Sequence, residues 1–189
     1  MHQLAERFTN KLIEWEIIKS EDKDLYTYGF WQGTIFIGNL LSVVVVGLLF
    51  RMLWQALVFT TAYGLLRIVA GGYHARTQRN CYIFSIAMII VVLSFLSYVP
   101  WIPWIFLPLV GLASLFIFIL APVEDANKPL DGLEKQVYKK RSRIILSFLL
   151  LLTGIFLFLG LDSLTYCLSI SLICVGFMVV LGQLVHTRK

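Results

Sequence analysis

The stretch WIFLPLVGLASLFIFILA, Trp104–Ala121, contains no charged residue. A bilayer core about 30 Å thick is crossed by about 20 helical residues, so this stretch has nearly the length of a transmembrane helix. Backbone groups in lipid need internal hydrogen-bond partners, which favours helices. Five other stretches are similar: Phe30–Phe50, Met52–Ala70, Cys81–Val99, Ile144–Leu161 and Leu164–Val185. The sequence predicts an all-α, polytopic membrane helical bundle.

The first two stretches leave the number of spans open. They contain the polar residues Gln32, Asn39, Gln55 and Arg67, and only Arg51 separates them. They either span the membrane fully or form a re-entrant pair that lines a polar cavity. We therefore expect four to six transmembrane helices, with six preferred.

Composition excludes a soluble enzyme, a disordered chain and a secreted disulfide scaffold. Of 189 residues, 59% are hydrophobic and 14% charged, against about 25% charged in soluble domains. The mean hydropathy is +0.82. Because apolar stretches and short loops fill nearly the whole length, we expect one membrane-embedded domain over residues 1–189.

The positive charges predict an orientation. The net charge is +5, and basic residues gather before Phe30, in loop 71–80, in loop 122–143 and in the tail. Basic loops face the cytoplasm, so both termini and both loops are expected there. The opposite turn carries Trp101 and Trp104, which fit an interfacial belt. No basic stripe alternates with aromatics, so no nucleic-acid partner is expected.

Residues 1–28 predict an amphipathic helix. Its apolar residues recur at spacings of three and four: Leu4, Phe8, Leu12, Trp15 and Ile18. Such a helix lies on the inner membrane surface or packs against the cytoplasmic end of the bundle.

The loop 71–80 and the residue after it hold the best chemical candidates, His74 and Cys81. Asn80 is a suitable N-cap for the next helix, which places Cys81 in its first turn. That position and nearby Arg79 favour negative charge, and the thiolate is the nucleophilic form of cysteine.

A histidine and a cysteine together suffice for acyl transfer. On a continuous helix they would be about 10.5 Å apart along the axis, so the loop has to fold back at Gly71-Gly72. From the residues alone, purely structural roles for His74 and Cys81 stay open. Cys167 and Cys174 are expected to be packing residues. The dispersed cysteines and histidines predict no metal site, and no cofactor is expected.

Two segments carry a family resemblance. LRIVAGGYHA, Leu66–Ala75, followed by Cys81, and APVEDANKPL, Ala121–Leu130, resemble motifs of the AgrB (accessory gene regulator B) family. AgrB proteins are membrane cysteine endopeptidases that process a small quorum-sensing peptide precursor. The resemblance implies that His74 is the general base and Cys81 the nucleophile.

The resemblance also implies a substrate and a product. Cys81 would cleave the C-terminal tail from an AgrD-like precursor, forming an acyl thioester that an internal cysteine or serine of the peptide converts to a thiolactone or lactone. The other implied partners are the lipid bilayer, which the resemblance identifies as a bacterial cytoplasmic membrane, and a second copy of the chain, as a homodimer.

Candidate substrate-binding residues are Arg67, Gly71, Gly72, Arg76, Arg79 and Lys128. Arg67 belongs to the family motif, although a snorkelling arginine is the alternative. The basic run Lys128–Arg143 serves topology or steers an acidic peptide tail. A third catalytic group is not identified among Gln78, Asn80, Glu124, Asp125 and Asp131, so a Cys/His dyad is expected.

Two other functions compete with the peptidase. A small transporter or exporter of a peptide or metabolite could use Gln32, Asn39, Gln55 and Arg67 as a polar path, but the sequence shows no inverted repeat. A non-catalytic membrane scaffold is the third possibility.

Overall fold

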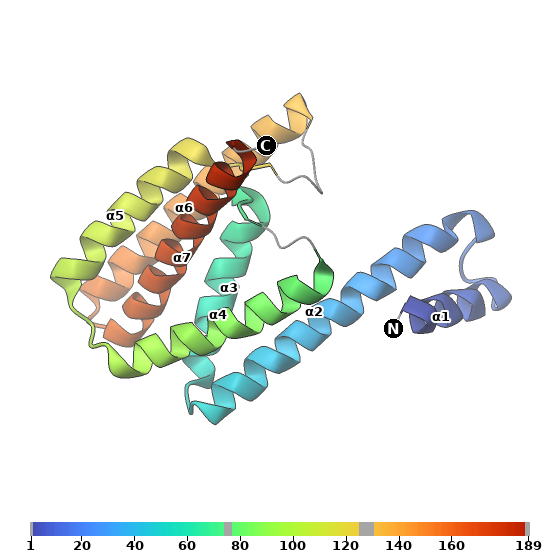
Figure 1. The fold of residues 1–189 in the computed structure, drawn as a ribbon, viewed down its shortest axis with the longest axis horizontal. Coiled ribbons are helices and arrows are strands. Elements are labelled where there is room, and N and C mark those ends of the chain that lie inside the picture. Colours follow the sequence, from blue (N-terminus) through green and yellow to red (C-terminus); the bar gives the residue numbers. More distant parts are fainter. Residues whose placement is uncertain (1, 74–76, 125–130, 188–189) are drawn as a thin grey trace. The chain divides into compact units, whose positions relative to one another are not determined.

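The computed structural model describes residues 2–73, 77–124 and 131–187. Its elements are α1 (His2–Glu14), the short 3₁₀ helix η1 (Ser20–Asp22), α2 (Lys23–Leu49), α3 (Leu53–Ala70), α4 (Gln78–Tyr98), α5 (Pro103–Leu120), α6 (Gly132–Phe158) and α7 (Asp162–Thr187) (Figure 1). Within these residues, the six helices α2–α7 are long and apolar enough to cross a membrane. The predicted all-α polytopic bundle with six spans is confirmed.

The chain forms two compact units, residues 1–42 and 43–189, which meet within α2. One functional domain over the whole chain stays a prediction. In the first unit, α1 contacts the start of α2 through two buried threonines, because the Thr27 hydroxyl donates to Thr9 Oγ1 at 3.1 Å. The rings of Phe8 and Phe30 lie 5.5 Å apart beside them.

The amphipathic helix is shorter than predicted. It ends at Glu14, and Glu16 has a positive φ of 55°, which the right-handed helix cannot continue through. Trp15 and Ile18 therefore lie outside the helix whose apolar face they were expected to extend. The position of α1 at a membrane surface stays a prediction.

The polar side chains of α2 bond within their own helix. Gln32 donates to the Tyr28 hydroxyl at 2.9 Å, and Asn39 donates to the Ile35 carbonyl at 3.0 Å. Each of these amides thus has a partner within α2, which gives the transporter interpretation no support.

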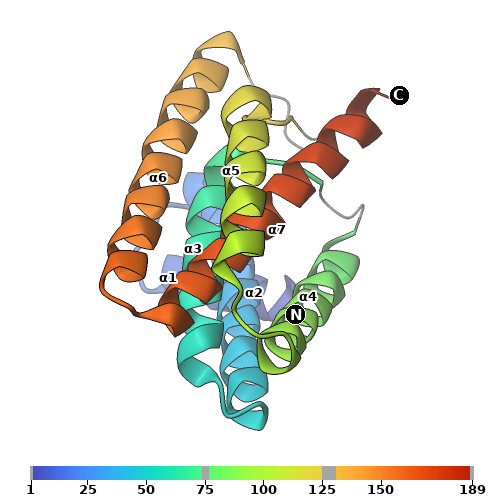
Figure 2. The same cartoon turned by 90° about the vertical axis from the view of Figure 1, so that its left-hand side faces the viewer.

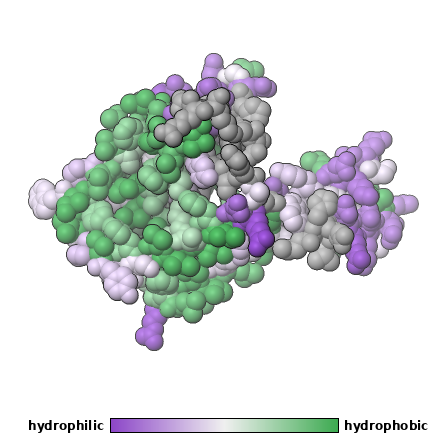
Figure 3. Space-filling model, viewed as in Figure 1, coloured by the Kyte–Doolittle hydropathy of each residue, from purple (hydrophilic) through white to green (hydrophobic). Residues whose placement is uncertain are grey.

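Helix α7 is the centre of the second unit. Two thirds of its spanning window is buried, against 39% or less for the other candidate spans. It packs against α3, α5 and α6 (Figures 1 and 2). Gly176 permits a close approach to α5, since a Cβ there would lie 2.8 Å from that of Ala113. The visible outer face of this unit is mainly hydrophobic, as expected next to lipid (Figure 3).

Both predicted loops are shorter than expected. Helix α6 begins at Gly132, inside the predicted loop 122–143, and Lys135 to Arg143 are helical. A capping box starts α6: the Asp131 side chain accepts from the backbone at Glu134, whose side chain accepts from the Asp131 N–H. Helix α4 likewise begins at Gln78, within the predicted loop 71–80.

An aromatic cluster closes the end of this unit where α4 joins α5. Trp101 is half-buried, with its ring 5.2 Å from that of Tyr166 and 5.3 Å from that of Phe106. The Tyr166 hydroxyl donates to the Val99 carbonyl at 3.1 Å. Trp101 thus packs against two aromatic rings of the bundle, whereas Trp104 is 89% exposed. The interfacial belt stays a prediction.

We expect Tyr166→Phe to lower the free energy of unfolding by about 1 kcal/mol, because it removes one hydrogen bond and keeps the ring. Tyr98→Phe is the matched control, since Tyr98 is 86% exposed on neighbouring α4. Unfolding in mixed detergent micelles, followed by circular dichroism, measures both. Equal stability of the two variants would contradict the role of the Val99 contact.

Candidate active site

The end of α3 is held by the segment that follows α5. Gly71 has φ +69° and forms a parallel bridge with Val123, whose N–H donates to the Ala70 carbonyl at 2.9 Å. A Cβ at Gly71 would overlap the Val123 carbonyl oxygen. Only glycine therefore fits this position, because both the positive φ and the close approach exclude a side chain.

The next residue rests on α7 by backbone-to-backbone contact. Gly72 has φ +115°, and a Cβ there would lie 2.7 Å from the Met178 carbonyl oxygen. Gly182, one turn further along α7, would place its own Cβ 2.6 Å from the carbonyl carbon of Gly72. The Tyr73 N–H donates to the Met178 carbonyl at 3.0 Å. Two facing glycines thus allow the loop to bond to the backbone of a helix.

Arg67 holds the same loop from the side of α3. Its guanidinium donates to the carbonyls of Gly71 and Tyr73. The planar fork of arginine suits two acceptors at once. Arg67 therefore ties α3 to the loop carbonyls, a different arrangement from the snorkelling arginine considered from the sequence.

Helix α4 begins with a cap that the sequence analysis placed wrongly. Thr77 is the N-cap, and its hydroxyl accepts from the Asn80 N–H at 3.2 Å. Asn80 is therefore the third residue of α4, and its N–H makes the hydrogen bond that is typical between this position and the side chain of the N-cap residue. Cys81 still lies at the start of α4, partly exposed, and its N–H donates to the Thr77 carbonyl at 3.0 Å.

The loop meets α4 close to Cys81. The ring of Tyr73 lies 6.5 Å from that of Phe84, one turn after Cys81 on α4. Arg67 on α3 donates to the carbonyl of the same Tyr73. We call Arg67, Tyr73, Cys81 and Phe84 the Cys81 cluster. Its contacts tie the residue that precedes His74 in the sequence to α3 and to the turn of α4 that follows Cys81.

The other predicted site residues are placed as follows. Arg79 is exposed in the first turn of α4, two residues before Cys81. His74, Arg76, Asp125 and Lys128 lie outside the described residues. Among the other candidates for a third group, Glu124 accepts from Lys135 at 2.8 Å and Asp131 caps α6. These two carboxylates thus already have partners at the start of α6.

Sequence reasoning missed the residues on which the loop rests. Met178 and Gly182 lie in an apolar stretch and belong to no motif, whereas Val123 lies in the motif segment Ala121–Leu130, which did not indicate its contact with Ala70. A glycine within an apolar helix was the only signal for Gly182, and it does not indicate which backbone approaches. The loop's partner on α7 is more than 100 residues away in sequence, so pattern alone could not identify it.

A comparison with known families decides the identity. The family described as Accessory gene regulator B matches residues 5–180. The chain belongs to the AgrB family. This membership supports an AgrB-type role in autoinducer peptide processing, with an AgrD-type peptide as substrate, in a multi-pass membrane protein.

Curated relatives agree with the AgrB assignment. An AgrB-like protein of Clostridium perfringens strain SM101 is 29% identical over 173 residues, which cover 86% of this chain and 78% of the relative. An AgrB-like protein of Listeria monocytogenes serotype 4b is 28% identical over 154 residues, covering 80% and 74%. No solved structure matches the chain significantly.

We expect Gly182→Ala to displace the loop from α7, because the new Cβ would lie 2.6 Å from the Tyr73 nitrogen. Hydrogen exchange at the Tyr73 amide should become about fivefold faster or more, as expected when one hydrogen bond of about 1 kcal/mol or more is lost. Gly111→Ala on α5 is the control, since a Cβ there meets open space. Unchanged exchange in Gly182→Ala would contradict the backbone contact.

Proposed function

We propose that this AgrB family protein is a membrane-embedded cysteine endopeptidase that removes the C-terminal tail of an AgrD-like precursor. Cys81 is the nucleophile and His74 the general base. The observation that carries the proposal is the Cys81 cluster: the thiol is partly exposed at the start of α4, and Tyr73, which precedes His74 in the sequence, packs against Phe84 one turn further along that helix.

The anchoring of Tyr73 supports the pairing of His74 with Cys81. Tyr73 is fixed at its N–H by Met178, at its carbonyl by Arg67 and at its ring by Phe84. Tyr73 immediately precedes His74 in the sequence, and Phe84 lies one turn after Cys81 on α4. A proton transfer needs the two side chains within about 3 Å, and the anchoring of the residue before His74 beside α4 supports the proposed pair.

The first chemical step is acyl transfer to sulfur. His74 takes the thiol proton, and the Cys81 sulfur attacks the carbonyl between the core and the tail of the precursor. A C–S bond forms and the C–N bond breaks. His74 then gives the proton to the leaving amine, which departs with the tail and leaves an acyl thioester on Cys81.

The start of α4 supplies candidate donors for the oxyanion. The amides of Asn80 and Cys81 already bond to Thr77. The first amides of a helix have no preceding turn to donate to, which leaves those of Gln78 and Arg79 for a developing negative charge, and the helix dipole favours that charge. Arg79, exposed on the same turn, together with Arg76 and Lys128, is proposed to contact the peptide.

The glycines and Arg67 act on the site in a different way. Gly71, Gly72 and Arg67 contact the protein's own backbone, so we propose that they position the loop and form part of the peptide-binding wall. The active site is proposed to face the cytoplasm, with both termini on that side. Dimerisation stays a prediction.

The second step closes the ring. A cysteine thiol or serine hydroxyl within the bound peptide attacks the thioester carbonyl, a new C–S or C–O bond forms, and the bond to Cys81 breaks as its sulfur regains a proton. A held nucleophile can contribute roughly 7–11 kcal/mol through effective molarity, which lets ring closure outrun hydrolysis.

Substitution of the dyad tests the peptidase. Co-expressed with a short precursor encoded nearby, Cys81→Ala and His74→Ala should each abolish tail cleavage, because one lacks the nucleophile and the other the base. Cys167→Ala should retain cleavage, since Cys167 is a packing residue of α7 with 1% exposure. Immunoblots of the precursor report cleavage, and cleavage by Cys81→Ala would refute the proposal.

The product ratio tests ring closure. Purified protein in nanodiscs, supplied with synthetic precursor, should yield mainly cyclic peptide, since water competes poorly with a held nucleophile. Mass spectrometry separates the ring from the linear peptide, which is heavier by one water. Replacement of the precursor's internal nucleophile by alanine should leave only linear product. A mostly linear product from the intact precursor would refute ring closure by this protein.

A further inference from the structure

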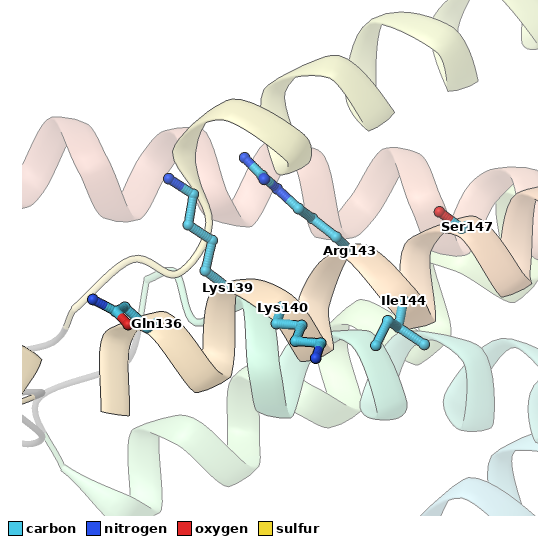
Figure 4. A pocket seen from close by; sticks show the side chains of 6 residues that line it. All are labelled: Gln136, Lys139, Lys140, Arg143, Ile144 and Ser147. Atoms are coloured by element: carbon cyan, nitrogen blue, oxygen red, sulfur yellow. The ribbon is translucent and has the colours of Figure 1, made fainter. Parts of the chain in front are cut away.

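A basic groove lies along one face of α6, outside the Cys81 cluster. It has a volume of about 520 Å³ and is lined by Gln136, Lys139, Lys140, Arg143, Ile144 and Ser147. Lys139 and Arg143 extend side by side from the helix, and Lys140 and Ile144 form the neighbouring row (Figure 4). The groove thus combines three cations with two polar side chains and one apolar one.

The groove lies where α6 changes from charged to apolar. Arg143 is the last charged residue of α6, and residues 144–158 have none. Exposed apolar side chains continue from the groove along one face, at spacings of four, three and four: Ile144, Phe148, Leu151 and Ile155, each at least 42% exposed. We call these four residues the α6 strip. A charged groove that continues into such a strip matches a headgroup with its acyl chain.

The arginine of the groove is held in place before any ligand arrives. Its guanidinium carbon lies 4.1 Å from the centre of the Phe118 ring on α5. Its Nε is buried, with no hydrogen-bond partner among the described residues. A guanidinium stacked in this way has already lost side-chain freedom, so binding an anion costs less entropy.

The groove's cations also differ from their neighbour Lys135. Lys135 pairs with Glu124 at 2.8 Å, whereas no ion pair of Lys139, Lys140 or Arg143 is found within residues 2–73, 77–124 and 131–187. Lysine and arginine near a membrane surface attract anionic lipids, and basic pockets on membrane proteins bind their headgroups. Arginine in particular suits phosphate through its paired N–H donors.

We propose that this groove binds the phosphate headgroup of an anionic phospholipid, with one acyl chain along the α6 strip. Lys139, Lys140 and Arg143 contact the phosphate, and Gln136 and Ser147 are placed to contact the polar part of the headgroup. The α6 strip favours a lipid over an acidic peptide, because a peptide held by the three cations would gain nothing from exposed apolar residues further along the helix. This inference does not depend on the peptidase activity.

Native mass spectrometry of the detergent-solubilised full chain tests the proposal with dioleoyl phosphatidylglycerol and dioleoyl phosphatidylcholine as probes. Wild type should bind phosphatidylglycerol more tightly than phosphatidylcholine. The double variant Lys139→Gln/Arg143→Gln should bind phosphatidylglycerol about 25-fold more weakly, since each of the two cations near an anionic lipid contributes about a fivefold factor. Lys135→Gln/Arg141→Gln is the control, because it removes two charges from the same helix outside the groove.

Further measurements separate loss of lipid binding from loss of the fold. Circular dichroism checks that the double variant keeps its helical content, and Arg143→Lys, which retains the charge but not the planar fork, should lose only part of the affinity. Equal loss in the control variant would show a non-specific charge effect and overturn the proposal. Displacement of the lipid by millimolar inorganic phosphate would indicate a free-phosphate site and also overturn it.

An acidic peptide is the rival ligand, and a synthetic glutamate-rich peptide probes it in the same samples. If the double variant loses binding of this peptide but retains phosphatidylglycerol, the groove serves a peptide and the lipid assignment is wrong. If it loses phosphatidylglycerol and the peptide binds neither protein, the lipid assignment is supported.

Discussion

The contact between two backbones, that of Gly72 and that of α7 at Gly182, is the constraint on which the site depends. A side chain at either position would overlap the other backbone. With both absent, the Tyr73 N–H reaches a helix carbonyl at 3.0 Å. Helix carbonyls normally accept hydrogen bonds from N–H groups of the same helix. A bond from another segment therefore forms only where the backbone of that segment lies unusually close to the backbone of the helix.

The same contact links the catalytic proposal to the bundle. Helix α7 is buried along most of its length and packs against α3, α5 and α6. A loop that is hydrogen-bonded to α7 is therefore held by the core of the bundle. Arg67 and Val123 secure the loop from two further sides. The proposed thiol chemistry benefits from this support, because it requires the catalytic groups to be positioned to within a few tenths of an ångström. The reaction rate falls steeply when such groups are misplaced.

The charged residues divide between the two tasks that a membrane enzyme has. Arg67 is used internally, on the protein's own carbonyls. Lys139, Lys140 and Arg143 form an open groove where α6 becomes apolar. A chain with only 14% charged residues thus uses some of them to hold its loop and presents others on its surface, where an anionic lipid could meet them.

Sequence alone predicted the fold class, four to six spanning helices with six preferred, the family resemblance and the pair His74 and Cys81 as candidates. These follow from apolar runs of bilayer length and from a local motif, both of which are readable without a partner. The structure places the starts of two helices earlier than the sequence predicted, because local hydrogen bonds cap them there: Thr77 rather than Asn80 caps α4, and α6 starts at Gly132. Only the tertiary structure decided what holds the motif. Gly182, Met178 and Val123 are far from it in sequence, and their role comes from backbone proximity, which no side-chain pattern encodes.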